Sequence, residues 1–563
     1  MAFMKERLLG RRKDIITYLV LAVIGAAFFC AIYGYRVLKP WYTDWMYNDG
    51  DIEQHFMGWL GYRAGSWTFP VGNSDVLSYP GTYSIVYTDS IPLFAVLFKL
   101  LSPFLPETFQ YFGLWGLMCF VLQAWFGGAI TGRFTESRIS MILGGTAFLL
   151  TPVFIQRMFV HTALAGHFVI LMALYLFVSY EHNHTKKTPY IWAGVTGFLC
   201  AGMHVYLLLM CGIIVASYAL LDLLKKKRIM RPVLVVLCYI SSALLNLFIL
   251  GALTSSNGSS STGGLGEFGF NLNSFFNPLY HSSLFFGELS IYNRNAENYA
   301  YLGLGVILMV IFAAVTTVIS FFGRKKGSGH KAEIASVLVL FFLTVIIASS
   351  PVITCADHKL FEYPVPGFID KVWSIFRSSG RIIWVDIYLL VIWGIWAVSK
   401  YVPRKAAPLI LCAVIAVQAA DISPLMRDKY EEFFPIVYKV NIMDNDIWRE
   451  VLSDPSVKHI YVTYECEPYS VHRFAFADMA LSSGRTMNQF LIARNEFTSE
   501  GLAADMFPIR DDTVYIFTDQ TIYLALGTDL KIIETGDGFR LGYSGGSDIF
   551  DRLEVDCDTI EAQ

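Results

Sequence analysis

The sequence has 563 residues, of which 55% are hydrophobic and only 16% are charged, and its net charge is −3. This composition excludes a disordered chain, a coiled coil, a collagen-like repeat and a small disulfide scaffold, and it predicts a membrane protein. The net charge hides an asymmetry, because residues 421–563 carry 26 acidic and 12 basic residues, whereas residues 1–420 carry 20 acidic and 31 basic residues. We therefore expect a basic membrane part and an acidic soluble part.

Apolar runs recur along the first three quarters of the chain. A helix that crosses the hydrocarbon of a bilayer needs about 20 mostly apolar residues, and the runs predict a polytopic α-helical membrane protein with about 11 transmembrane helices. Residues 190–222 could form one long tilted helix, but Gly202, Met203 and His204 interrupt the run and favour a hairpin of two. The predicted spans are residues 15–35, 108–130, 139–155, 162–180, 190–203, 204–222, 232–251, 301–322, 333–350, 382–399 and 407–421.

Lysine and arginine recur in every second loop, which predicts the orientation of the chain, because loops retained in the cytoplasm are enriched in these residues. The basic segments lie within residues 5–13, 133–138, 186–187, 225–231, 324–331 and 400–405. The N-terminus is therefore predicted to be cytoplasmic, and the loops 36–107, 252–300 and 351–381 to be extracytoplasmic. We expect a transmembrane domain over residues 1–421 in a bacterial plasma membrane.

The first outer loop concentrates residues that could carry chemistry. Asp49 and Asp51 flank a glycine, and Asp51, Gln54 and His55 have the spacing of one helix face. A carboxylate pair at a membrane surface can remove a proton from a hydroxyl or bind a hard cation that holds a phosphate. The alternative is that these acidic residues are simply solvated.

Histidines and arginines on the outer side form a second group of candidates. His161, His167 and His204, with His55, are predicted near outer helix ends, where they could bind a metal or serve as hydrogen-bond partners. Arg377 and Arg381 lie four residues apart before a span, which suits an anionic ligand such as a lipid-linked phosphate. Snorkelling or local ion pairing is the alternative. Further outer basic residues are Arg63, Arg157, Arg294 and Lys359.

Beyond the last predicted span the apolar runs shorten to strand length. They predict strands over residues 459–464, 513–518, 530–534 and 539–543, with a hairpin at Gly536 and Gly538 and a helix over residues 471–481. We therefore expect an extracytoplasmic α/β domain over residues 422–563. Its negative charge argues against nucleic-acid binding.

The layout of a basic N-terminus, one span, an acidic outer loop, paired short spans and an outer C-terminal domain resembles the GT-C superfamily of membrane glycosyltransferases. More closely, the chain resembles a bacterial branch of this superfamily with the pattern Gly-Asp-x-x-Gln-His-x-x-Gly-Trp, present at residues 50–59. Further motifs of that branch correspond to Thr-Asp-Ser-Ile-Pro at residues 88–92, the pair His161 and His167, Tyr-Leu-Gly-Leu-Gly at residues 301–305 after Glu297, and Arg-x-Ser-Gly-Arg at residues 377–381.

The resemblance implies sugar transfer from a polyprenyl-phosphate donor to an extracytoplasmic glycan, lipid or protein. Asp51 looks like the essential aspartate, with Asp49 as the competing assignment. Arg377 and Arg381 would stabilise the departing phosphate. Asp89 or Glu297 would assist by a hydrogen bond or through a divalent cation, Mg²⁺ or Mn²⁺. The second outer loop lacks the acidic pair of some branches, so the resemblance does not establish a metal requirement.

Two other classes of function remain open. A transporter or lipid flippase would use the same outer residues as a gate, but it would usually show internal repeats, and none is found. A non-catalytic anchor for the C-terminal domain would leave the polar residues of the first outer loop scattered. Sugar transfer instead predicts that Asp51 converges with Arg377 and Arg381 on one cavity.

Overall fold

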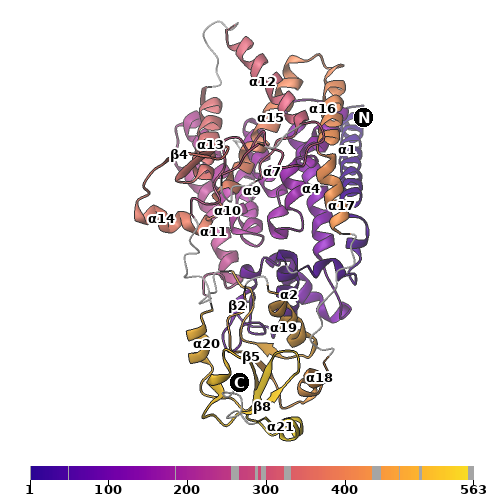
Figure 1. Ribbon diagram of the computed structural model, residues 1–563. Helices are drawn as coiled ribbons and strands as arrows, with labels where there is room; N and C mark the ends of the chain where they lie inside the picture. Colours follow the sequence, from indigo (N-terminus) through magenta and orange to yellow (C-terminus); the bar gives the residue numbers. More distant parts are fainter. Residues whose placement is uncertain are drawn as a thin grey trace. The chain divides into compact units, whose positions relative to one another are not determined.

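A computed structural model of the protein (Figure 1) describes residues 2–48, 50–183, 186–254, 265–285, 289–292, 299–322, 331–433, 445–467, 470–493 and 497–555. The chain forms two compact units. The first unit comprises residues 1–42, 109–246 and 261–435, and the second comprises residues 43–108, 247–260 and 436–563.

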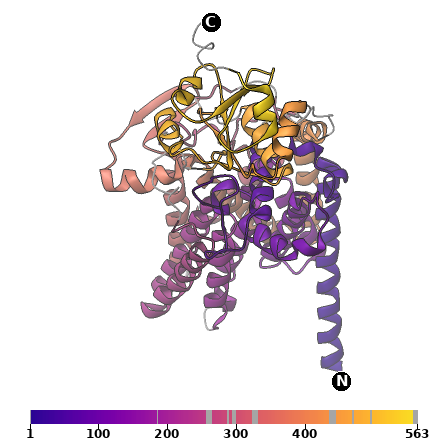
Figure 2. The ribbon, with the colours of Figure 1, turned by 90° about the horizontal axis from the view of Figure 1, so that it is seen from below.

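The first unit is built mainly of helices. Helix α1 is one continuous helix (Figure 2). A short hairpin of β3 (Val352–Cys355) and β4 (His358–Glu362) precedes α14 (Gly367–Trp373). The longer helices are α1 (Ala2–Tyr33), α4 (Phe112–Thr131), α10 (Val205–Lys226), α11 (Met230–Ile249), α12 (Leu304–Phe322), α13 (Lys331–Ser349) and α15 (Trp384–Tyr401). The shorter helices are α5 (Arg138–Leu149), α6 (Pro152–Arg157), α7 (Phe168–Val178), α8 (Tyr180–Asn183), α9 (Thr188–Ala201), α16 (Ala407–Asp421) and α17 (Ser423–Glu432).

Every predicted span overlaps helical structure, but the predicted span 139–155 is divided between α5 (Arg138–Leu149) and α6 (Pro152–Arg157). Within the described residues, seven helices are long and apolar enough to cross a membrane, or eight if α16 and α17, bent by 52°, count as one span. The protein is thus an integral membrane protein by the length and composition of its helices. The remaining predicted spans correspond to shorter helices such as α7, whose side chains are almost all buried. The total of 11 spans stays a prediction.

The predicted break in residues 190–222 is confirmed. Helix α9 ends at Ala201, and α10 begins at Val205. His204 caps the second helix, because its Nδ1 accepts a hydrogen bond from the backbone N–H of Tyr206 at 3.1 Å. A side chain that satisfies a free N–H in the first turn stabilises the start of a helix.

The C-terminal part of the second unit is an α/β structure, as the strand-length runs predict. Its five strands lie in the order β6 (Thr486–Met487), β5 (His459–Val462), β7 (Thr513–Phe517), β9 (Arg540–Tyr543) and β8 (Lys531–Glu534). Strand β5 pairs in parallel with β6 and β7, whereas β9 pairs antiparallel with β7 and β8. All residues of the central strand β7 are buried. The accompanying helices are α18 (Asp446–Ser453), α19 (Val471–Ser482), α20 (Ser499–Asp505) and α21 (Asp548–Leu553).

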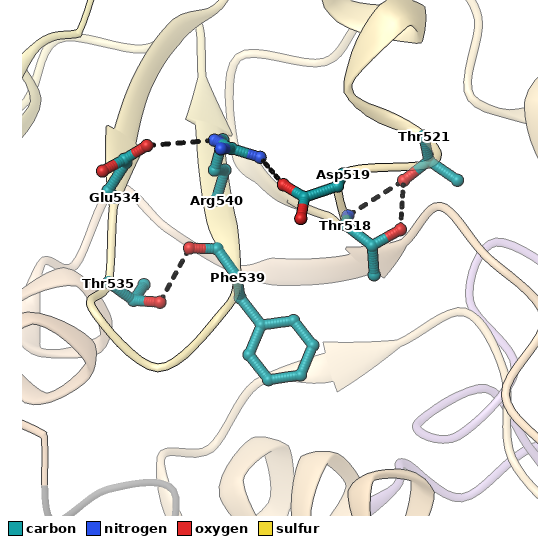
Figure 3. Close-up of polar contacts among 7 residues, drawn as sticks. All are labelled: Thr518, Asp519, Thr521, Glu534, Thr535, Phe539 and Arg540. Carbon is teal, nitrogen blue, oxygen red and sulfur yellow. Dashed lines mark hydrogen bonds and ion pairs between the residues drawn. The ribbon is translucent and has the colours of Figure 1, made fainter. Parts of the chain in front are cut away.

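The predicted hairpin joins β8 to β9. Gly536 and Gly538 adopt φ values of +79° and +93°, which side chains with a Cβ rarely tolerate. Figure 3 shows how Arg540 holds the neighbouring strands, through ion pairs with Glu534 and Asp519. Ion pairs as well as backbone hydrogen bonds therefore join the hairpin to the end of β7.

The first outer loop packs against the C-terminal sheet within the same unit. The loop contains α2 (Asp51–Ala64), the short strands β1 (Asn73–Ser74) and β2 (Tyr83–Ser84), and α3 (Pro92–Leu101). Backbone hydrogen bonds join Tyr79 and Val76 to Met487 at 2.9 and 2.8 Å. Segments that are about 400 residues apart in sequence therefore extend one hydrogen-bonded structure at the edge of the sheet.

Candidate functional site

The predicted carboxylate of the first outer loop lies at the start of α2. Asp51 is the first residue of this helix, and Gly50 precedes it with extended backbone. The helical spacing of Asp51, Gln54 and His55 is confirmed, so they share one face. The amide groups at the start of a helix favour negative charge there. Asp49, the competing catalytic candidate, lies outside the described residues.

The turn at residues 88–92 packs against α2. The Ser90 hydroxyl donates to the carbonyl of His55 at 2.7 Å and shares a hydrogen bond with the hydroxyl of Thr88 at 2.8 Å. Asp89 and Ile91 both adopt a φ of +53°, which is rare for a β-branched residue such as isoleucine. Backbone strain of this kind concentrates at functional sites, where the surrounding structure maintains it.

Gly58 explains how closely the turn approaches the helix. A Cβ at this position would lie 2.5 Å from the Cβ of Thr88 and 2.7 Å from the Oγ of Ser90. Real Cβ atoms do not tolerate contacts this short, so only glycine fits. The two sequence motifs at residues 50–59 and 88–92 therefore form one packed structure, with Asp51 on its helix and Asp89 in its turn.

Two polar residues near Asp51 hold the start of α2 in place. The buried Gln54 donates from Nε2 to the carbonyl of Leu491 at 2.7 Å. The buried Glu53 accepts a hydrogen bond from the backbone N–H of Asn48 at 3.0 Å. That Gln54 binds a substrate stays a prediction. In the structure, its side chain fixes the start of α2 to the C-terminal segment.

In the first unit, the arginine motif forms a compact turn. The backbone N–H of Ser378 donates to the Tyr206 hydroxyl at 2.9 Å, and that of Gly380 donates to the carbonyl of Phe268 at 3.0 Å. The Arg381 guanidinium lies 5.1 Å from the centre of the Tyr206 ring, and the Arg377 guanidinium lies 5.6 Å from that of Phe268. Both distances are typical of cation–π contacts.

Arg381 and Arg377 differ in their exposure. Arg381 is only 8% exposed, and its Nε makes no hydrogen bond within the described part of the chain. Arg377 is exposed. A buried guanidinium with an unmet donor is uncommon and calls for an explanation, which an anionic ligand would supply.

A buried polar chain begins next to the arginine turn. Trp384 lies three residues after Arg381, and its ring centre is 4.5 Å from that of His167. The Nδ1 of His167 is 2.6 Å from the Tyr388 hydroxyl, which also accepts a hydrogen bond from Gln123 at 2.9 Å. His167 is fully buried, and among the described residues its Nε2 has no partner.

The other predicted histidines have structural positions. His204 caps α10, and its ring lies 5.4 Å from that of Tyr206, which contacts Arg381. His161 precedes the 3₁₀ turn at Thr162–Ala165, where its carbonyl accepts a hydrogen bond from the N–H of Leu164. Their predicted roles in substrate binding stay predictions.

The motif at residues 301–305 anchors the start of α12 to the end of α16. The Asp421 carboxylate accepts hydrogen bonds from the Tyr301 hydroxyl and the Leu304 N–H, both at 2.8 Å. A Cβ on Gly303 would lie 2.0 Å from the Nε2 of Gln418. This motif therefore has a structural role. Glu297, the acidic candidate before it, lies outside the described residues.

The structure adds residues that sequence analysis did not select. Tyr206 and Trp384 organise the arginine turn, and the buried Arg157 lies 5.9 Å from the Trp384 ring. Aromatic residues at span ends are common, so composition alone could not separate these from an interfacial belt. Their positions give the sequence signal that could have identified them. Tyr206 lies two residues after His204, at the break before α10, and Trp384 lies three residues after Arg381.

Each compact unit gathers part of the predicted site. The second unit holds Asp51, Asp89, Gln54 and His55 around α2, and the first holds Arg377, Arg381, His167 and His204. The described residues contain no group of three or more histidines, cysteines or acidic residues placed to hold a metal ion. That Asp51 meets the arginines in one cavity stays a prediction.

Comparison with known proteins gives a family and several similar solved structures, two of which are described here. The family described as "Domain of unknown function (DUF6311)" matches residues 22–423. No curated protein matches the chain. The crystal structure of the Archaeoglobus fulgidus oligosaccharyltransferase in the apo form is 11% identical, with a TM-score of 0.45 over 94% of this chain and 75% of that one. The same enzyme tethered to an acceptor peptide containing the NVT sequon is 10% identical, with a TM-score of 0.41 over 94% and 74% of the chains.

Proposed function

The chain belongs to the DUF6311 family, and we propose that it is a membrane glycosyltransferase. It transfers a sugar from a polyprenyl-phosphate donor to an acceptor outside the cytoplasm. The acceptor is a glycan, a lipid or a protein. The proposal rests on the residues of this chain and on the resemblance of their motifs to the GT-C superfamily.

The observation that carries the proposal is the buried arginine turn. Arg381 is held against Tyr206 with its Nε unmet among the described residues, and Arg377 lies four residues before it. Guanidinium groups bind phosphate oxygens through paired, charge-assisted hydrogen bonds. A lipid-linked phosphate is therefore a suitable ligand for this turn in a protein with several membrane-length helices.

The carboxylates of the first outer loop supply the second half of the proposal. Asp51 begins a helix that is held in place by the strained turn of Asp89, and Gly58 allows their close packing. Such an arrangement keeps an acidic side chain in one position, as general base catalysis requires. Asp51 is our assignment for the base, and Asp49 is the alternative.

In the proposed reaction, Asp51 accepts the proton of an acceptor hydroxyl. The hydroxyl oxygen then forms a bond to the anomeric carbon of the sugar, and the bond from this carbon to the phosphate oxygen breaks. The phosphate leaves with the electron pair, and Arg377 and Arg381 stabilise its charge. Asp89 or Glu297 assists by a hydrogen bond or by holding a divalent cation.

The test uses the full chain, purified and reconstituted in proteoliposomes with a radiolabelled polyprenyl-phosphate sugar and a membrane extract as the acceptor. We expect Asp51→Asn to lower the transfer rate by about 10²–10⁴-fold, the usual contribution of a general base. Arg381→Ala should lower it by about 10²–10³-fold, the usual effect of removing one group that stabilises the leaving charge. Assays with and without Mg²⁺ or Mn²⁺ test the cation.

Matched controls separate catalysis from folding. Asp529→Asn changes an exposed carboxylate in the C-terminal part, and Arg404→Ala changes an arginine whose side chain is 70% exposed; both should retain full activity. Full activity in both Asp51→Asn and Arg381→Ala would refute the assignment. Movement of the labelled lipid between leaflets without cleavage of the sugar would support a flippase instead.

A further inference from the structure

Helix α3 of the first outer loop has an inverted pattern of burial. Its only charged residue, Lys99, is 4% exposed, whereas Leu100 is 65% exposed. The exposed apolar residues of α3 and of the 3₁₀ turn that follows it (Ser102–Phe104) share one face at helical spacing, and they are Leu97, Leu100, Leu101 and Phe104. A helix on the surface of a soluble protein buries its leucines and exposes its lysine. This face of α3 is therefore suited to an apolar environment.

The polar group on the buried face of α3, the Lys99 ammonium, has its contacts within the same unit. The Lys99 ammonium lies 4.1 Å from the centre of the Tyr62 ring and 4.9 Å from that of Trp67, and it donates to the carbonyl of Ser66 at 3.2 Å. Burial lowers the pKa of Lys99 to about 8. The cation is thus held against the turn at residues 66–70, and rotation of α3 to expose it would break these contacts.

The same turn lies beside the end of a membrane-length helix. The backbone N–H of Val71 donates to the carbonyl of Ile249, the last residue of α11, at 2.9 Å. The Phe69 ring, in a residue 69% exposed, makes an edge contact with Phe248 at 5.8 Å. Because α11 is long and apolar enough to cross a bilayer, the turn lies next to one end of a candidate membrane span.

We propose that α3 and the adjoining turn form an interfacial element, in which Leu97, Leu100, Leu101 and Phe104 enter the lipid at the end of α11. Amphipathic helices in this position lie along the boundary between headgroups and acyl chains. Trp67 and Phe69 suit the same boundary, where aromatic rings are enriched. The proposal is independent of the proposed catalytic function.

The test is photocrosslinking of the full chain in vesicles of phosphatidylethanolamine and phosphatidylglycerol. The variant Phe104→benzoylphenylalanine places a photoreactive ring at a position that is 86% exposed and aromatic in the natural protein. The matched control is Tyr523→benzoylphenylalanine, which changes a 60% exposed aromatic residue in the C-terminal part of the same unit. Lipid adducts are measured by mass spectrometry.

We expect several-fold more lipid adduct at residue 104 than at residue 523. Leu100→benzoylphenylalanine provides a second position on the same face and should behave like the first. Equal labelling at residues 104 and 523 would overturn the proposal. A crosslink between two protein chains at residues 100 and 104 would also overturn it, because this face would then be covered by a second copy.

Discussion

Histidines in this protein serve different purposes that their residue type does not reveal. His204 accepts a hydrogen bond as a helix cap, and His167 joins a buried chain through Tyr388. His459, on strand β5, stacks on Tyr79 of the first outer loop with ring centres 3.6 Å apart. The surroundings of each ring therefore decide its role.

His459 leads to a prediction about pH. Burial, together with Lys458 and Arg510, lowers the pKa of His459 below the ordinary value of 6.5, although Asp512 opposes the shift. As the pH falls through 6.5 towards the lower pKa of His459 in the folded unit, the unfolded chain therefore binds more protons than the folded unit, and acid destabilises the fold. We expect hydrogen exchange of β5, corrected for its intrinsic pH dependence, to accelerate as the pH falls through this range.

The variant His459→Gln tests this attribution, because it removes the titrating ring. It should weaken the acid-dependent part of the exchange, whatever its effect on stability at pH 8. His472→Gln, which changes an exposed histidine on α19, is the matched control and should keep the wild-type profile. The attribution is wrong if both variants show the same acid dependence as the natural chain.

Among the elements, α2 packs closely against the turn at residues 88–92 because Gly58 has no side chain. We expect Gly58→Ala to destabilise the second unit by about 1–3 kcal/mol, the usual cost of forcing extra volume into a packed site. It should also lower sugar transfer, because the displaced turn carries Asp89 and supports the helix of Asp51. Thermal unfolding and the transfer assay measure the two effects.

Gly546→Ala is the matched control for this element. No atom lies within 4 Å of a Cβ built at Gly546, so this substitution should change neither stability nor activity. Unchanged stability of Gly58→Ala would show that the turn is free to move away from α2. The strained conformations of Asp89 and Ile91 would then not depend on that contact.

At the scale of the whole molecule, ion pairs join loops that are predicted to share the cytoplasmic side. Arg138 pairs with Asp14 at 3.5 Å, and Arg404 pairs with Glu136 at 3.2 Å. Lys225 pairs with Glu333 at 2.6 Å. Two side chains can form an ion pair only if their loops lie at the same end of the helices. The ion pairs therefore support the prediction that the basic loops share one side of the membrane.

The orientation leads to a prediction about labelling. We expect a membrane-impermeant maleimide to label Gly546→Cys in intact cells, and Arg404→Cys only after permeabilisation, because the basic loops remain inside. Peptide mass spectrometry separates the introduced cysteines from the natural ones. The reversed pattern would place the C-terminal part in the cytoplasm and would remove the basis for sugar transfer outside it.

Much of this architecture is predictable from local sequence patterns. Apolar length predicts the helices, apolar runs of strand length predict four strands of the C-terminal sheet, and the interruption at Gly202 predicts the break before α10. The i, i+3, i+4 spacing of Asp51, Gln54 and His55 correctly places them on one helix face. These features depend on residues that are close in sequence, so a single chain is enough to predict them.

Other features required the tertiary structure. The buried face of α3, the approach of the turn to Gly58, the anchoring of Tyr301 by Asp421, and the pairing of Met487 with Val76 and Tyr79 all join distant segments. Their partners cannot be identified from local periodicity, because hydrogen bonds and packing contacts depend on how the chain folds back on itself. The sequence by itself thus determined which residues could carry chemistry, whereas the tertiary structure decided which of them are held in place, which are caps or anchors, and which apolar face of α3 is left exposed.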